Sequence, residues 1–217
     1  MCIRDRAAFR TKILFDTNQL LQRAKSEEEI LSQTASQLMK LLNRSLIVYP
    51  EQNGVLGSEQ VFGVDDETAQ NIFSAPEERD AANWTFANKK RSGAGTDSCP
   101  DAKGLYLALR TGGGVFGVVG IDLSEKPLDA FENSVLLSIL GEGALAIENR
   151  RNALEKEQAT VQAQNEQLRA NLLRTISHDL RTPLTSISGN ASNLLSNGET
   201  LDTETRNKIC TDIFDDA

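Results

Sequence analysis

The residues of this chain best suited to chemistry lie in the eight-residue stretch Ser177–Leu184, which reads SHDLRTPL and contains the only histidine among 217 residues. Asp179 follows His178 directly, and its carboxylate can accept a hydrogen bond from the ring Nδ1–H, which leaves Nε2 with a free lone pair. Thr182 lies one helical turn from His178 on the same face. Together these residue types favour a nucleophilic imidazole that meets a large partner from solvent.

The helix expected to carry this stretch has an apolar stripe on the side opposite His178. The stripe consists of Leu173, Ile176, Leu180, Leu184, Ile187, Ala191 and Leu194. Its members recur with the 3.6-residue period of an amphipathic helix, so His178 is expected to face solvent. Pro183 removes a backbone hydrogen bond in mid-helix, so we expect the helix to loosen or bend there. A lone histidine on a helix is usually an ordinary residue, and only these neighbours favour a functional one.

All eight residues resemble the phosphoacceptor box of the sensor histidine kinases of two-component systems. The resemblance implies that His178 is the phosphoacceptor, that Asp179 is its hydrogen-bond acceptor and general base, and that Thr182 positions water for the reverse, phosphatase reaction. It also implies ATP and Mg²⁺ held by a separate ATP-binding domain, because these 217 residues contain no D-x-G-x-G box. We therefore expect no cofactor or metal site here, and no autophosphorylation by this chain alone.

Composition narrows the class of protein. Hydrophobic residues make up 39% and charged residues 25%, as in globular proteins, and the net charge of −8 argues against a nucleic-acid partner. We expect no signal peptide and no run of roughly 18–20 apolar residues that would span a bilayer. The three cysteines, Cys2, Cys99 and Cys210, have no metal-ligand spacing and are expected to be free thiols. A redox role for Cys99 is the alternative.

The first 150 residues alternate helix and strand signals and predict an α+β domain. The expected helices are 7–24, 26–42, 66–73, 76–90 and one that begins near Asp129; the expected strands are 46–49, 60–63, 105–109 and 115–123. Ser26 with Glu29 is a capping-box pattern, and Pro50 is expected to end the first strand. Residues 91–103 are predicted to be a loop, and Gln52–Gly54 a turn.

The segment Gly112–Gly117 fits the dinucleotide pattern G-x-G-x-x-G. That pattern needs a helix after the glycines, so that the helix N-terminus can meet a pyrophosphate. A strand is predicted here instead. We therefore favour a hairpin turn, and a phosphate cradle stays the alternative.

Three stretches outside the box resemble the GAF region of KdpD-type sensor kinases, which respond to potassium and turgor. They are Trp84 in a helix, Lys90–Asp97 and Leu105–Leu109. The continuation after the box, Ser186–Ala191, is similar to the same family too. The resemblance implies an antiparallel sheet backed by helices. It also implies that the chain is the cytoplasmic portion of an inner- or plasma-membrane protein.

The aromatic side chains of this region allow two interpretations. Trp84, Phe86, Tyr106 and Phe116 either form core, which we favour, or line a ligand pocket. The sequence names no ligand.

The expected domain organisation has four parts: a leader at 1–14, a GAF-like domain at 15–150, a coiled-coil signalling helix at 151–172, and a truncated dimerisation and phosphoacceptor domain at 173–217. Ile147, Leu154, Val161 and Leu168 fall seven residues apart, as one seam of a coiled coil would. The other seam positions are polar, among them Arg150 or Arg151. A marginal two-stranded stalk and a solvated connecting helix both fit this pattern.

The last part is expected to be a helical hairpin. Asn197-Gly198 is a helix-end signal, and Asp202 or Thr203 caps the next helix. The resemblance implies that a second copy completes a four-helix bundle and that a KdpE-like response regulator receives the phosphoryl group. We expect a fragment cut at both ends, with Met1–Arg6 an arbitrary edge. The rival interpretations are a GAF-type ligand-binding module that only dimerises and a scaffold without chemistry.

Overall fold

The computed structural model describes residues 3–63, 66–197 and 199–217. It divides into two compact units, Met1–Leu154 and Glu155–Ala217, which are treated separately below. Cys2 and Gly198, which entered the sequence predictions, lie outside the described residues, as does part of the predicted edge Met1–Arg6.

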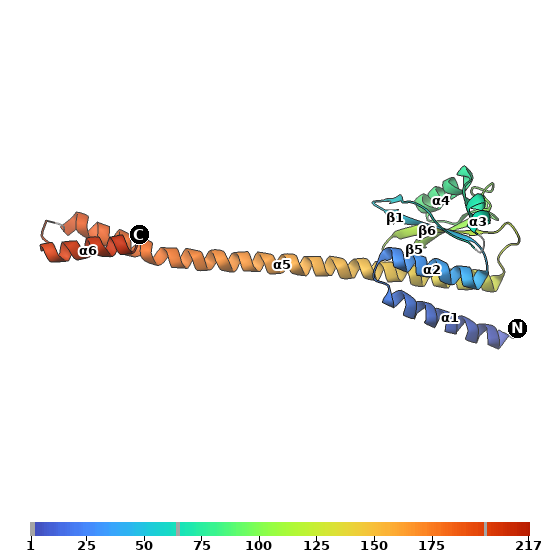
Figure 1. Cartoon of the computed structure of the whole chain (residues 1–217), viewed down its shortest axis with the longest axis horizontal. Helices are drawn as coiled ribbons and strands as arrows, with labels where there is room; N and C mark the ends of the chain where they lie inside the picture. Colours follow the sequence, from blue (N-terminus) through green and yellow to red (C-terminus); the bar gives the residue numbers. More distant parts are fainter. Residues whose placement is uncertain (1–2, 64–65, 198) are drawn as a thin grey trace. The chain divides into compact units, whose positions relative to one another are not determined.

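The elements follow the predicted alternation of helices and strands (Figure 1). The helices are α1 (Ile3–Arg23), α2 (Glu27–Leu42), α3 (Asp66–Phe73), α4 (Pro76–Asn88), α5 (Ala130–Asn197) and α6 (Thr203–Asp215). The strands are β1 (Leu46–Gln52), β2 (Val55–Leu56), β3 (Gln60–Phe62), β4 (Ser92–Gly93), β5 (Gly104–Arg110) and β6 (Val115–Asp122).

The first unit is built on one antiparallel sheet. Its strand order is β2-β1-β6-β5-β4, and β3 also pairs with β1. The central hairpin of β5 and β6 brings Leu107 opposite Val119, and β1 adds to β6 with Val48 opposite Val119. Gly112–Gly114 lie in the turn of that hairpin, which confirms the hairpin and leaves no helix N-terminus after the glycines.

Helices cover both faces of this sheet (Figure 1). One core lies between the sheet, α2 and the first turns of α5, with Leu38, Val48 and Ile139 among its members. The second lies between the sheet, α3 and α4, with Ile47 and Ala82 among its members. Since side chains of a strand alternate between faces, strands covered on both sides must be apolar throughout, which is why their sequences look continuous rather than alternating.

The helix ends confirm the predicted capping residues. Ser26 Oγ accepts a hydrogen bond of 3.1 Å from Glu29 N at the start of α2. Before α5, Glu132 N donates to Asp129 Oδ1 at 2.7 Å, and Asp129 N donates back to Glu132 Oε2 at 2.9 Å. This reciprocal pair is a capping box, and it satisfies backbone donors that the first helical turn leaves free.

Two predictions about the strands are wrong. Pro50 does not end β1: the strand continues through it to Gln52, because the φ of proline fits an extended strand and the Pro50 carbonyl accepts from Gly57 N at 2.8 Å. The predicted loop at 91–103 contains the short strand β4, which pairs with β5. The turn prediction is confirmed, since Asn53 and Gly54 both have positive φ, as the type I′ turn between β1 and β2 requires.

Judged by length and hydropathy alone, the prediction that no run of residues is apolar enough to span a bilayer is also wrong. Among the described residues one helix, α5, contains an 18-residue window with a mean hydropathy of 1.3. In this structure 39% of that window is buried. The buried side chains of α5, from Val135 to Ile147, belong to the core of the first unit, and this packing accounts for their apolar character.

The second unit contains the rest of α5 and the helix α6, which runs back along the last turns of α5 (Figure 1). Asp202 caps α6 by accepting from Thr205 N at 2.8 Å. This hydrogen bond is the largest cause of the lowered pKa of Asp202. Ile209 of α6 is only 8% exposed, so the two helices share a small apolar contact, as the predicted hairpin requires.

Candidate phosphoacceptor site

The three predicted site residues lie together on one stretch of α5. His178 and Asp179 are both open to solvent, with 79% and 70% of their side chains exposed, and Thr182 is exposed one turn further on. His178 Nδ1 lies 3.4 Å from Asp179 Oδ1, at the long limit of a hydrogen bond. The imidazole is therefore accessible to a large partner, and the adjacent carboxylate is within reach of its Nδ1.

The backbone beneath the site is a continuous helix with one weakened turn. Pro183 lies inside α5, so the carbonyl of Asp179 lacks the usual donor four residues later. In the next turn the Thr185 hydroxyl donates to the Arg181 carbonyl at 2.7 Å. The helix continues through Pro183, so Asp179 and Thr182 stay beside His178.

The apolar stripe of this helix is uncovered in the single chain. Leu173, Ile176, Leu180 and Leu184 are each between 52% and 64% exposed. Leu180 and Leu184 also line a shallow groove along α5, together with Arg181 and Ser188. Apolar side chains grouped in this way on one helix face mark a surface that packs against another protein.

The segment between the two predicted domains carries only exposed apolar positions. Leu154, Val161 and Leu168, three members of the predicted heptad seam, are at least 38% exposed, whereas Ile147 is fully buried in the core of the first unit. The stalk and the solvated helix therefore both stay open for residues 154–168, and Ile147 belongs to the core instead.

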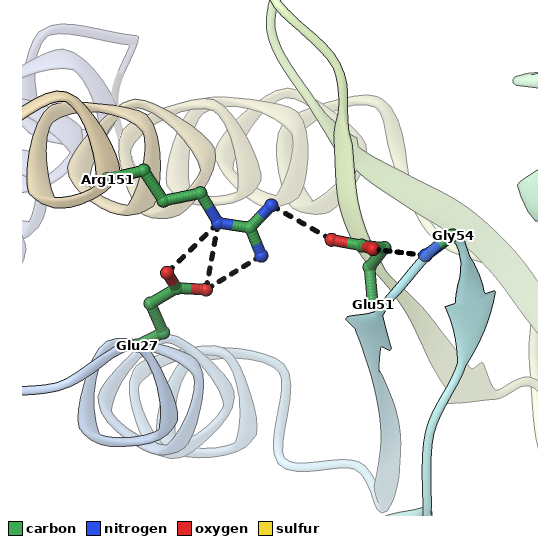
Figure 2. Close-up of polar contacts among 4 residues, drawn as sticks. All are labelled: Glu27, Glu51, Gly54 and Arg151. Carbon is green, nitrogen blue, oxygen red and sulfur yellow. Dashed lines mark hydrogen bonds and ion pairs between the residues drawn. The ribbon is translucent and has the colours of Figure 1, made fainter. Parts of the chain in front are cut away.

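Arg151 does not extend the seam but anchors α5 to the first unit (Figure 2). Its guanidinium forms an ion pair of 2.8 Å with Glu27, at the start of α2, and one of 2.9 Å with Glu51, on β1. It also lies over the Phe116 ring, 5.2 Å from the centroid. Sequence reasoning missed this role, because no local pattern links three residues that far apart in the chain.

The charges of this cluster, defined as Glu27, Glu51 and Arg151, stabilise one another. The hydrogen bonds that the Arg151 guanidinium donates to Glu27 are the largest cause of the raised pKa of Arg151. Burial is the largest single influence on Glu51 and opposes its ionisation, but hydrogen bonds from Gly54 N and Arg151 together outweigh it and lower the pKa of Glu51. The charged form of Glu51 is thus favoured beside the arginine.

The aromatic residues divide between the two predicted roles. Tyr106 is fully buried and Phe116 is 7% exposed, so both are core, as favoured from the sequence. Phe86 is half-buried and packs against the second core, whereas the half-buried Trp84 lines an open cleft at the edge of the sheet. The favoured core interpretation is thus confirmed for three of the four residues, and the pocket interpretation stays a prediction for Trp84.

A buried carboxylate that sequence reasoning missed lies beside Tyr106. Glu78 on α4 is 1% exposed and accepts hydrogen bonds from Lys103 N at 2.6 Å, Gly104 N at 3.1 Å and the Tyr106 hydroxyl at 2.7 Å. Burial, and then this carboxylate, raises the pKa of Tyr106. Three donors to one buried acid tie the loop before β5 to α4, a role in folding rather than in chemistry.

Two smaller predictions concern metals and thiols. Among the described residues no group of three or more His, Cys, Asp or Glu side chains is placed to hold a metal ion. Cys99 and Cys210 are free thiols. Cys99 adopts a positive φ of 55° in the loop before β5 and packs against the second core.

Comparison with known proteins places this site in a family. The model of the His Kinase A (phospho-acceptor) domain matches residues 168–213, which include His178, Asp179 and Thr182. The sensor protein KdpD of Clostridium acetobutylicum is 34% identical over 209 residues, 96% of this chain and 23% of the relative. The sensor protein KdpD of Escherichia coli is 29% identical over 185 residues, 84% of this chain and 20% of the relative. The chain thus spans less than a quarter of the length of either relative.

Solved structures similar to this chain include GAF domains. The GAF domain of the potassium sensor histidine kinase KdpD from Escherichia coli covers 70% of this chain and 99% of its own length, with 20% identity and a TM-score of 0.47. The GAF domain of a putative sensor histidine kinase from Pseudomonas syringae covers 72% of this chain and 96% of its own, with 20% identity and a TM-score of 0.49. On the sequence matches, this chain is a KdpD-type sensor histidine kinase region with a GAF-like domain and a HisKA phosphoacceptor segment.

Proposed function

We propose that this chain is the cytoplasmic signal-input and phosphoacceptor portion of a membrane-bound sensor histidine kinase that responds to potassium or osmotic change. In this proposal His178 accepts a phosphoryl group from ATP and passes it to an aspartate of a KdpE-like response regulator. The observation that supports it best is the exposed His178 side chain, within a complete phosphoacceptor box, on the helix that matches the HisKA model.

The chemistry assigned to the chain's own residues is nucleophilic. The Nε2 lone pair of His178 attacks the γ-phosphorus of ATP, a nitrogen–phosphorus bond forms, and the bond to the departing ADP breaks. Asp179, 3.4 Å from Nδ1, orients the ring and stabilises the positive charge that develops on it. The response-regulator carboxylate then attacks the same phosphorus, and His178 leaves as the neutral imidazole.

ATP and Mg²⁺ would be supplied from outside the described residues, by an ATP-binding domain. Magnesium would neutralise charge on the transferring phosphate, as in other phosphoryl transfers. For the reverse reaction, the Thr182 hydroxyl lies one turn from His178 and would orient the attacking water.

The uncovered stripe supports a homodimer as the working form. Leu173, Ile176, Leu180 and Leu184 form a face wide enough to pack against a second copy of the helical hairpin, which would complete a four-helix bundle. An aspartate in place of Leu180 should then shift the chain toward monomer in sedimentation velocity. Ser186→Asp is the matched control, because Ser186 is exposed on α5 outside the stripe.

The relay is tested by supplying the missing catalytic domain. The purified chain is mixed with a separately expressed ATP-binding domain of a KdpD-type kinase and labelled Mg-ATP, and acid-labile phosphate is measured. We expect label on the wild-type chain, none on His178→Gln, and none on the wild-type chain without the added domain.

Two results would contradict the proposal. Equal labelling of His178→Gln would show that another residue accepts the phosphate. A dimeric chain that stays unlabelled with an ATP-binding domain proven active on its own acceptor would favour the rival interpretation, a ligand-binding module that only dimerises.

A further inference from the structure

A cleft of about 620 Å³ opens at the edge of the sheet in the first unit. It is bounded by the end of α4 and the loop after it, by β5, and by the first turns of α5. Its principal lining residues are Trp84, Lys89, Lys90, Arg91, Leu107 and Arg110. Its volume falls within the range of small-molecule sites, about 300–1,000 Å³.

The cleft concentrates positive charge in an acidic protein. Four cations, Lys89, Lys90, Arg91 and Arg110, line it against one acid, Asp97, although the chain as a whole has a net charge of −8. Among the ion pairs of the described residues, none involves any of these four cations. Unpaired like charges that face one cleft repel one another, and an anion placed between them would relieve that repulsion.

The loop that carries Lys89, Lys90 and Arg91 is held by hydrogen bonds at both ends, and Arg110 lies on β5. Lys89 ends α4 with a φ of 57°, and its N–H donates to the Thr85 carbonyl at 2.8 Å. Further along, the Thr96 hydroxyl lies 2.8 Å from both the Gly93 and the Ser98 carbonyls. A loop tied down at both ends presents its charges with little ordering cost when a ligand binds.

The rest of the lining is apolar or aromatic. Trp84 is half-buried, Leu107 is 7% exposed and Leu137 of α5 is 52% exposed. An indole and two leucines offer nothing to a bare phosphate ion, but they suit a planar, weakly polar group. The two arginines offer planar forks that match phosphate oxygens.

We propose that this cleft binds a small organic phosphate that carries a planar ring, the chemistry of a nucleoside diphosphate. The phosphates lie among Arg91, Arg110 and the two lysines, and the ring packs beside Trp84 and Leu107. The site is independent of His178 and of the relay, and its test needs no kinase activity.

Trp84 makes the test direct, because it is the only tryptophan of the chain. The 217-residue chain is titrated with ADP, inorganic pyrophosphate or adenosine while the intrinsic fluorescence is followed, and calorimetry is run in parallel. We expect saturable binding that is tightest for ADP, weaker for pyrophosphate and weakest for adenosine. Affinity for ADP should fall as salt is raised from about 50 to 300 mM, because salt screens exposed charges.

A charge-matched pair of variants separates this site from general attraction. Arg91→Gln/Arg110→Gln should weaken ADP binding by about tenfold or more, since each loses a charge-assisted contact. Lys40→Gln/Arg169→Gln removes the same charge at exposed positions away from the cleft and should bind like the wild type. All four side chains lie half-buried or exposed at the surface, so circular-dichroism melting should show both variants folded.

Three results would overturn the proposal. They are the absence of heat and of any fluorescence change with millimolar ADP, equal weakening in both double variants, and tighter binding of pyrophosphate than of ADP. Binding to phosphatidylserine vesicles that Arg91→Gln/Arg110→Gln abolishes, with no binding of ADP, would assign the cations to a membrane surface instead.

Discussion

Replacing Arg151 by methionine should weaken the first unit at the point where α5 leaves it. Methionine keeps most of the length of the arginine stem and is a good helix former, so the helix itself is little affected. The change removes the guanidinium that joins Glu27 and Glu51 (Figure 2). The loss therefore measures the ionic cluster and not the helix propensity.

The contacts that are lost set the size of the effect. The Glu51 side chain is 13% exposed, and losing its charged partner should cost about 1.5 kcal/mol. Glu27 is 34% exposed, so solvent screening limits that pair to about 0.5 kcal/mol. The contact with Phe116, at 5.2 Å, adds about 0.5 kcal/mol. We expect a decrease in the free energy of unfolding of about 2–3 kcal/mol.

Urea unfolding followed by Trp84 fluorescence measures the decrease in the free energy of unfolding, because the only tryptophan lies in the first unit. With a slope of about 2 kcal/mol per molar urea, the midpoint should fall by about 1 M. Arg150→Met is the matched control: Arg150 is the adjacent residue, and none of the ion pairs among the described residues involves it. Its midpoint should shift by less than about 0.25 M.

A double-mutant cycle assigns the effect to the ion pair. Combining Arg151→Met with Glu51→Gln should cost less than the two single changes taken separately, by about 1 kcal/mol. Additive costs would show that Arg151 and Glu51 do not interact in solution. A midpoint for Arg151→Met equal to that of Arg150→Met would refute the anchoring role altogether.

Three further predictions concern the same unit, each measured by urea unfolding. Gly143→Ala should destabilise the first unit by about 1–2 kcal/mol, because the new Cβ would lie 2.7 Å from Thr34 Oγ1. The new Cβ of Gly141→Ala meets nothing within 4 Å, so this control should stabilise α5 by about 0.5–1 kcal/mol. Equal effects of the two substitutions would contradict this packing. Glu78→Ala should cost about 3 kcal/mol, since it leaves three donors unpaired, and Glu78→Gln should cost less. Because the pKa of Glu51 is lowered in the folded protein, its ionised form stabilises the fold above the ordinary pKa near 4.5, and this contribution is lost as pH falls through the lower folded value. Glu51→Gln should therefore flatten the pH dependence of the free energy of unfolding below pH 5. An unchanged slope would contradict the lowered pKa.

Much of the fold followed from local patterns in the sequence. Ser26 before α2, the Asn53-Gly54 turn and the Asp129 capping box each depend on residues within four positions of one another, and all three are present. The error at Pro50 has the opposite origin. The proline rule describes the average strand, and here the neighbouring strands β6 and β2 decide where β1 ends.

The parts that were missed depend on contacts distant in the sequence. Glu78 has no local signal of burial in the sequence, because the donors that bind it come from residues 103–106. Arg151 was assigned to a seam, because its partners lie 124 and 100 positions away. Buried charges of this kind become visible only when the sheet brings their partners together.

The position of Arg151 also limits how the first unit can influence the helix that carries His178. The buried side chains of α5 end at Ile147, and the Arg151 ion pairs follow one turn later. From Leu154 to Leu184, no described side chain of α5 is buried. Within the first unit, the described ion pairs of α5 end at this cluster, so a change in the GAF-like core that moves α5 would also act on these contacts. Because the contacts of that cluster are charged and partly exposed, they can be broken and remade at a cost far below that of unfolding the core, which is the property that a two-state element requires.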